Sequence, residues 1–113
     1  MVGIHGQGAA ASDNIQVHLW DTATGRLLGT FEDAGETITS IALSRDGKFL
    51  FGGGMNKSIL IWSTKSRKLI RKLVGHRGPV LAVEVSPSGK YLATGSYDTT
   101  IMLWDVKRIC QRP

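Results

Sequence analysis

The sequence predicts an all-β protein built from repeated four-stranded antiparallel sheets. Trp20, Trp62 and Trp104 recur at 42-residue intervals along the 113-residue chain, and a period of roughly 20–50 residues is typical of a repeat architecture. Residues 38–44 (ITSIALS) alternate apolar and small polar residues, which indicates a strand. Asp46-Gly47 then gives a hairpin signal between two apolar runs. No segment shows an apolar stripe at helical spacing, so we expect almost no helix.

The third copy of the repeat, residues 75–105, is the most complete. It opens with Gly75-His76, carries Asp98 in a turn and closes with Trp104-Asp105. The second copy keeps Trp62 and has Asn56 in place of the aspartate, and its segment SRDGKFLFGGG aligns with SPSGKYLATGS. The first copy retains Asn14 and Trp20-Asp21. A Gly-His opening and a Trp-Asp ending in a unit of this length resemble the WD40 repeat family.

The resemblance implies a β-propeller of four-stranded blades, over residues 8–108. We expect residues 1–7 to be disordered, a partial blade at about 8–31, a full blade at about 38–73, three strands at about 80–105 and a tail at 109–113. Closed propellers have about 4–8 blades, so these blades cannot close a ring alone. We expect either a fragment of a longer protein, which supplies the missing blades in cis, or completion in trans by another chain.

The resemblance also implies a structural hydrogen-bonded tetrad of His76, Ser96, Asp98 and Trp104, with Thr94 as the other candidate for the hydroxyl. A buried indole N–H and a buried carboxylate both need partners. The second copy replaces these groups by Ala34, Gly54 and Asn56 and keeps only Trp62. We therefore expect the full network in the third blade alone. The His–Asp–hydroxyl set is explained by folding, and we identify no catalytic residue.

The remaining composition excludes several classes of protein. Cys110 is the single cysteine, and with three dispersed histidines it shows no metal-ligand spacing. The triple glycine at 52–54 is not followed by a phosphate-loop pattern, so close backbone approach beside a turn is the better interpretation. The N-terminus does not resemble a secretory signal, and no apolar run is long enough for a membrane helix. We expect a non-enzymatic, intracellular protein, cytoplasmic or nuclear, without cofactor or metal.

The resemblance implies a scaffold that mediates protein–protein interaction and complex assembly. Family members often bind partners near the Gly-His loop and the turn before the aspartate, which makes Arg77, Tyr97 and Met55 the candidate binding residues. Charge offers an alternative, because residues 47–83 hold eight basic residues and no acid. An RNA- or ribonucleoprotein-associated factor of the ribosome-assembly type, or a binder of another acidic partner, would use the basic stretch 65–77. Its basic patch is Lys65, Arg67, Lys68, Arg71 and Lys72.

Overall fold

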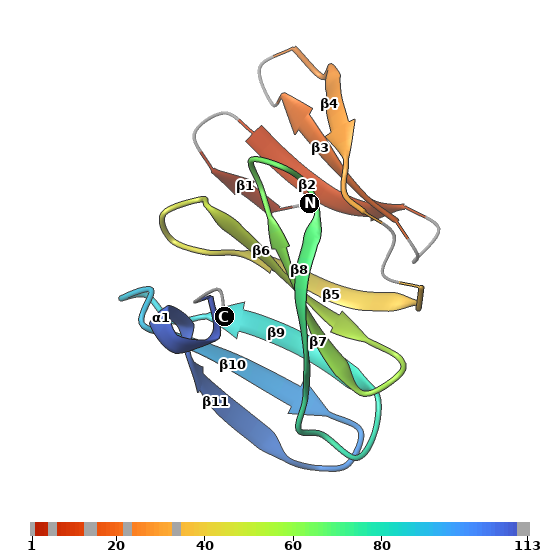
Figure 1. Ribbon diagram of the computed structural model, residues 1–113, viewed down its shortest axis with the longest axis vertical. Helices are drawn as coiled ribbons and strands as arrows, with labels where there is room; N and C mark the ends of the chain where they lie inside the picture. The colour runs from red at the N-terminus through yellow and green to blue at the C-terminus, as the bar shows by residue number, and fades with distance from the viewer. Residues whose placement is uncertain (1, 5–6, 13–15, 22–23, 33–34, 111–113) are drawn as a thin grey trace.

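The fold is all-β, as the sequence predicts, and consists of three antiparallel sheets stacked along the long axis of the molecule (Figure 1). The computed structural model describes residues 2–4, 7–12, 16–21, 24–32 and 35–110, and the side chains of residues 17–18, 24–32 and 35–110. The three sheets are not closed into a ring, in agreement with a partial propeller.

Within each sheet the strands follow one another in sequence order, since each pairs with the next through a short turn. The first sheet comprises β1 (Val2–Ile4), β2 (Gln7–Ser12), β3 (Gln16–Asp21) and β4 (Leu27–Thr30). The second comprises β5 (Ile38–Leu43), β6 (Phe49–Gly54), β7 (Ser58–Ser63) and β8 (Leu69–Val74). The third comprises β9 (Val80–Val85), β10 (Tyr91–Ser96) and β11 (Ile101–Asp105), after which comes the short helix α1 (Val106–Ile109).

The N-terminal segment corrects one expectation. Residues 1–7 were expected to be disordered, yet Val2–Ile4 form β1, and Gln7 already belongs to β2. β1 pairs antiparallel with β2 in the register Val2↔Ala9, Gly3↔Gly8 and Ile4↔Gln7. This pairing satisfies backbone groups that would otherwise form an open edge of β2. The first sheet therefore has four strands rather than the partial set expected for residues 8–31.

The core lies between the sheets and depends on the alternation of side chains along β6 and β7. Leu50, Leu60 and Trp62 face the first sheet and pack there with Val17 and Phe31. The intervening side chains face the third sheet in a second cluster, in which Phe51, Ile59 and Ile61 pack with Val80, Val83, Leu92 and Ile109. Every residue of β7 is buried, because a neighbouring sheet covers each face. This explains why SILIWS reads as a continuous apolar run.

Among the described residues, the third sheet is covered on one face only, although residues 100–104 (TIMLW) are as apolar as the doubly covered strand β7. Trp104 and Leu92 face the second sheet and join its apolar cluster. Ile101 and Leu103 point the other way and are 77% and 71% exposed, and Leu81 and Tyr91 are about half exposed. No strand of the described residues pairs with the outer edge of β11, since the sheet order is β11-β10-β9. We call the exposed apolar side of this sheet, with Leu81, Tyr91, Ile101 and Leu103, the open face.

The triple glycine of β6 marks three close approaches, in agreement with the interpretation from sequence. A Cβ atom at Gly52 would lie 2.8 Å from Cζ3 of Trp62. One at Gly53 would lie 3.0 Å from the backbone oxygen of Val80 in the third sheet, and one at Gly54 would overlap the carboxylate of Glu36. Real Cβ atoms do not approach neighbours this closely, so the three positions require glycine for packing rather than for binding a phosphate.

Candidate interaction surface and its supporting hydrogen-bond network

The connections between strands lie at two opposite ends of the sheets. The loop 75–79 and the turns 55–57 and 97–100 lie at one end, which we call the loop end. The hairpins 44–48 and 86–90 and helix α1 lie at the other, which we call the hairpin end. This separation follows from the antiparallel order of the strands, because successive turns alternate between the two ends. The candidate binding residues all belong to the loop end.

A buried hydrogen-bond network connects the loop end to the core of the third sheet. His76 is buried, and its Nε2 lies 2.8 Å from Oγ1 of Thr94. The indole Nε1–H of Trp104 donates to the same Thr94 oxygen at 3.0 Å. On its other side, His76 Nδ1 lies 3.1 Å from Oγ1 of Thr100 and 3.4 Å from Oδ2 of Asp98. Thr94 accepts the indole proton and has its own hydroxyl hydrogen available for Nε2, which leaves Nδ1–H directed at Asp98 and Thr100.

The structure corrects one member of the predicted tetrad, because Thr94 and not Ser96 supplies the hydroxyl. Ser96 Oγ instead donates to the backbone oxygen of Pro79 at 3.0 Å and accepts from the backbone N–H of Asp98 at 3.1 Å. Thr94 and Ser96 are two residues apart on β10, so strand alternation places both side chains on the same face and does not distinguish them. The pairing of β10 with β9 shifts between Gly95 and Ser96, and Ser96 closes the turn beyond this bulge.

Asp98 fixes the loop that carries Arg77. Its Oδ2 accepts from the backbone N–H of Arg77 at 2.7 Å, and its Oδ1 accepts from both the backbone N–H and the hydroxyl of Thr100. These bonds, with the Thr100 hydroxyl as the largest contributor and the Arg77 N–H next, hold the pKa of the Asp98 carboxyl well below its usual value. The ionised carboxylate therefore ties the loop 75–79 to the turn 97–100.

The lowered pKa of Asp98 predicts a loss of stability in acid. A depressed carboxyl pKa contributes stability that is fully present above the ordinary value of 3.8 and is lost as the pH falls through the folded-state value. We expect the free energy of unfolding to decline below about pH 4, and we expect Asp98→Asn to flatten this part of the profile. Urea unfolding between neutral pH and pH 2 measures both effects. An acid limb equally steep in Asp98→Asn would contradict the assignment.

The second sheet replaces this network with an ion pair between a buried glutamate and a partly exposed lysine, which the sequence analysis missed. The Glu36 side chain is 2% exposed, and its Oε2 lies 3.3 Å from Nζ of Lys72 on β8. Its Oε1 accepts from the backbone N–H of Asn56 at 3.0 Å, in the space left free by Gly54. Trp62 donates its indole N–H to the backbone oxygen of Glu32 at 2.8 Å. The sequence did contain a signal for this pair. When the second and third copies are aligned, Glu36 and Gly54 stand where the third copy has Gly78 and Ser96.

The other signature positions fall in several environments. Gly75 lies against Trp104, since a Cβ atom there would be 3.0 Å from its ring, and Asp105 caps helix α1 by accepting from the Arg108 N–H at 3.3 Å. Trp20 and Asp21 belong to β3, but their side chains lie outside the described residues, as do Asn14 and Ala34 altogether.

The three candidate binding residues present exposed side chains from firmly bonded backbone. Tyr97 is 75% exposed, and its N–H donates to Pro79 O at 3.0 Å. Met55 is 45% exposed, and its N–H donates to Thr37 O at 2.9 Å. Arg77 is exposed beside a hollow of about 370 Å³ that it lines together with Gly75, Asp98, Thr100 and Met102. The loop end thus displays a cation, an aromatic ring and a thioether on fixed turns.

The basic patch, in contrast, does not form one surface. The Arg67 side chain packs over Gly29 of β4, Arg71 donates to the backbone oxygen of Ile109 at 3.2 Å, and Lys72 pairs with Glu36. Arg71 and Lys72 are neighbours in β8, so their side chains leave opposite faces of the sheet. Lys65 and Lys68 are exposed near the hairpin end. Contacts within the protein therefore engage three of the five basic side chains.

The described part of the chain offers neither a metal site nor a membrane-spanning helix. Among those residues, no cluster of three or more His, Cys, Asp and Glu is placed to hold a metal ion. No helix in the described segments is long and apolar enough to cross a membrane.

Comparison with known proteins identifies the class. The model of the family "WD domain, G-beta repeat" matches residues 25–63 and 67–105, and the chain therefore belongs to the WD40 repeat family. No curated protein matches it significantly. A solved structure titled "Structure of U3-55K" is similar with a TM-score of 0.83 and 25% sequence identity, over 91% of this chain and 33% of that one. The chain thus spans about a third of the length of that structure.

Proposed function

We propose that the protein is a non-catalytic scaffold that mediates protein–protein interaction and complex assembly through its loop end, with Arg77, Tyr97 and Met55 as the contact residues. One observation carries the proposal: Tyr97 is 75% exposed on a turn whose backbone is held on both sides. Aromatic and arginine side chains are enriched among the residues that dominate binding energy. WD40 membership supports the general role of an interaction platform.

The hydrogen-bond network gives this surface its rigidity. Asp98 binds the Arg77 backbone, His76 joins Asp98 to the buried Thr94, and Thr94 accepts from the Trp104 indole. Side chains displayed from loops that are already ordered lose less conformational entropy when a partner binds. The tetrad therefore acts as the support of the binding surface and has no chemical role of its own.

The open face is the second element of the proposal. Ile101 and Leu103 are more than two-thirds exposed on a sheet whose outer β11 edge pairs with no strand of the described residues. In the second sheet the corresponding apolar residues are fully buried by a neighbouring sheet. We propose that a further blade covers the open face, supplied either in cis by a longer protein or in trans by another chain. The single cysteine is in keeping with an intracellular location, cytoplasmic or nuclear.

The alternative is an RNA- or ribonucleoprotein-associated factor that uses the stretch 65–77. Arg67, Arg71 and Lys72 already make contacts within the protein, so a polyanion would meet Lys65 and Lys68 as the two readily available members of the patch. Few phosphate contacts give weak binding with a shallow salt dependence. The positions of these side chains therefore favour the protein-binding proposal.

Quantitative affinity purification from cells, with bound protein and bound RNA both measured, separates the two proposals. We compare the wild-type chain with Arg77→Ala/Tyr97→Ala and with Lys65→Ala/Lys68→Ala. The scaffold proposal expects the first variant to lose its protein partners by about tenfold or more, while the second keeps them. Retention of all protein partners by Arg77→Ala/Tyr97→Ala would refute the loop-end surface. If RNA co-purifies with the wild-type chain in a salt-sensitive manner and is lost only from Lys65→Ala/Lys68→Ala, the alternative is established.

A further inference from the structure

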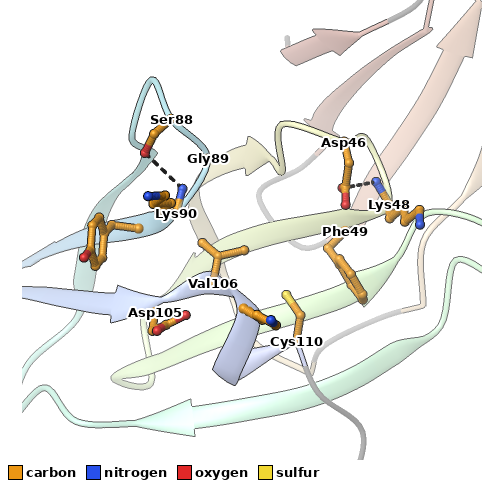
Figure 2. A pocket seen from close by; sticks show the side chains of 11 residues that line it. Asp46, Lys48, Phe49, Ser88, Gly89, Lys90, Asp105, Val106 and Cys110 are labelled. Carbon is orange, nitrogen blue, oxygen red and sulfur yellow. Dashed lines mark hydrogen bonds between the residues drawn. The ribbon is translucent and has the colours of Figure 1, made fainter.

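A second hollow lies at the hairpin end, opposite the proposed binding surface. It has a volume of about 650 Å³ and opens between the hairpins 44–48 and 86–90 and helix α1 (Figure 2). Its walls include Phe49, Tyr91 and Val106, and three lysines from three separate elements, Lys48, Lys90 and Lys107. A cavity of this size holds a few residues of a peptide rather than a single ion.

The charge of the cavity is positive because its three lysines outnumber its two carboxylates, whose oxygens are held by hydrogen bonds within their own hairpin and helix. Asp46 accepts from the hydroxyl of Ser44 at 2.7 Å and from the backbone N–H of Lys48 at 2.9 Å, and the latter bond is drawn in Figure 2. Asp105 accepts from the backbone N–H of Arg108 at 3.3 Å as the N-cap of α1. The two ion pairs between described residues involve none of the three lysines, whose side chains are exposed.

Part of the wall between the lysines is apolar. Phe49 and Val106 are half-buried and pack against the cluster between the second and third sheets. Cys110 lies beside them, and burial raises the pKa of its thiol to about 11, so it carries no charge at neutral pH. Positive charge around an apolar centre complements a ligand that has negative charge around an apolar side chain.

We propose that this cavity binds an acidic peptide segment of a partner protein, with one apolar side chain placed against Phe49 and Val106 and with flanking carboxylates at Lys48, Lys90 and Lys107. A free anion would use the lysines and leave the apolar wall in water. The site lies at the far end of the sheets from Arg77, Tyr97 and Met55, so it is independent of the loop-end surface. The second and third sheets together would then contact two different partners at once.

Fluorescence anisotropy with a short labelled peptide, in which glutamates flank one leucine, tests the proposal on the 113-residue chain. We expect Lys90→Gln/Lys107→Gln to weaken binding by about tenfold, since each exposed ion pair contributes modestly. The matched control Arg26→Gln/Lys57→Gln removes the same charge at exposed positions outside the cavity and is expected to leave the affinity unchanged. Circular dichroism and thermal unfolding confirm that both variants fold as the wild type does.

Peptide variants and a competitor make the test independent of protein folding. Replacing the glutamates by glutamine, or the leucine by serine, is expected to weaken binding at least about fivefold in each case. Equal loss in the two protein variants would reduce the effect to overall charge and overturn the proposal. Undiminished binding of the serine peptide, or displacement of the peptide by single-stranded RNA at equal concentration, would overturn it as well.

Discussion

Replacing Trp62 by alanine is expected to lower the free energy of unfolding by about 4 kcal/mol. Trp62 is fully buried and makes an edge-to-face contact with Phe31, with ring centroids 6.2 Å apart. Its ring also fills the space above Gly52. Alanine would leave a cavity between the first and second sheets and an unpaired backbone oxygen at Glu32, to which the indole N–H now donates. Urea unfolding followed by circular dichroism measures the loss.

Leu103→Ala is the comparison at an exposed position, because Leu103 occupies the position in the third sheet that Ile61 occupies in the second. Ile61 is fully buried, whereas Leu103 is 71% exposed. Leu103→Ala is expected to change the free energy of unfolding by at most about 0.5 kcal/mol. A large loss in Leu103→Ala would show that the open face is covered in solution, by a second copy of the chain. Concentration-dependent unfolding would identify that case.

Thr94→Val is expected to destabilise the chain by about 3 kcal/mol, although valine has nearly the same shape as threonine. The Thr94 side chain is fully buried and is the hydrogen-bond partner of both the Trp104 indole and His76 Nε2. Valine would leave both nitrogen atoms without this partner inside the sheet, and unpaired buried polar groups are costly. Urea unfolding at neutral pH, with proton NMR of the His76 ring, measures the stability and the local change.

Ser96→Ala provides the comparison that separates the two candidate hydroxyls. Ser96 bonds only to backbone atoms of the loop and the turn, so we expect a loss of about 1 kcal/mol and an unchanged indole environment of Trp104. If Ser96→Ala proved the more damaging substitution and shifted the Trp104 indole resonance, Thr94 would not be the centre of the network. The pair of variants therefore tests the correction made by the structure.

The 42-residue repeat period predicts most of the architecture. Hairpin signals such as Asp46-Gly47 and the apolar run of β7 predict strands, and the 42-residue shift places each in its sheet, which the structure confirms for β5 to β11. The short helix α1 was missed because one turn gives no periodic signal. Strand β1 was missed because three residues, Val2–Ile4, are too few to show alternation.

The candidate site was predicted less completely, for a physical reason. His76, Asp98 and Trp104 can be assigned from sequence because the third copy offers one candidate for each at its signature position. The choice between Thr94 and Ser96 depends on a bulge that shifts the register between Gly95 and Ser96. Glu36 was missed because its partner Lys72 lies 36 residues away and belongs to a different strand. Side chains from distant strands meet only when the sheet geometry is known, and the cavity at the hairpin end depends on the same geometry.

The burial of β6 and β7 on both faces also determines the order in which the chain loses structure. Stacked units of this kind unfold from their ends, because each contacts only its neighbours. The first sheet can separate by losing one apolar cluster, and the third by losing the other. The second sheet contributes to both clusters, so whichever end opens first, its middle strands remain packed against the opposite sheet. We therefore expect these strands to form the last cooperative unit to melt.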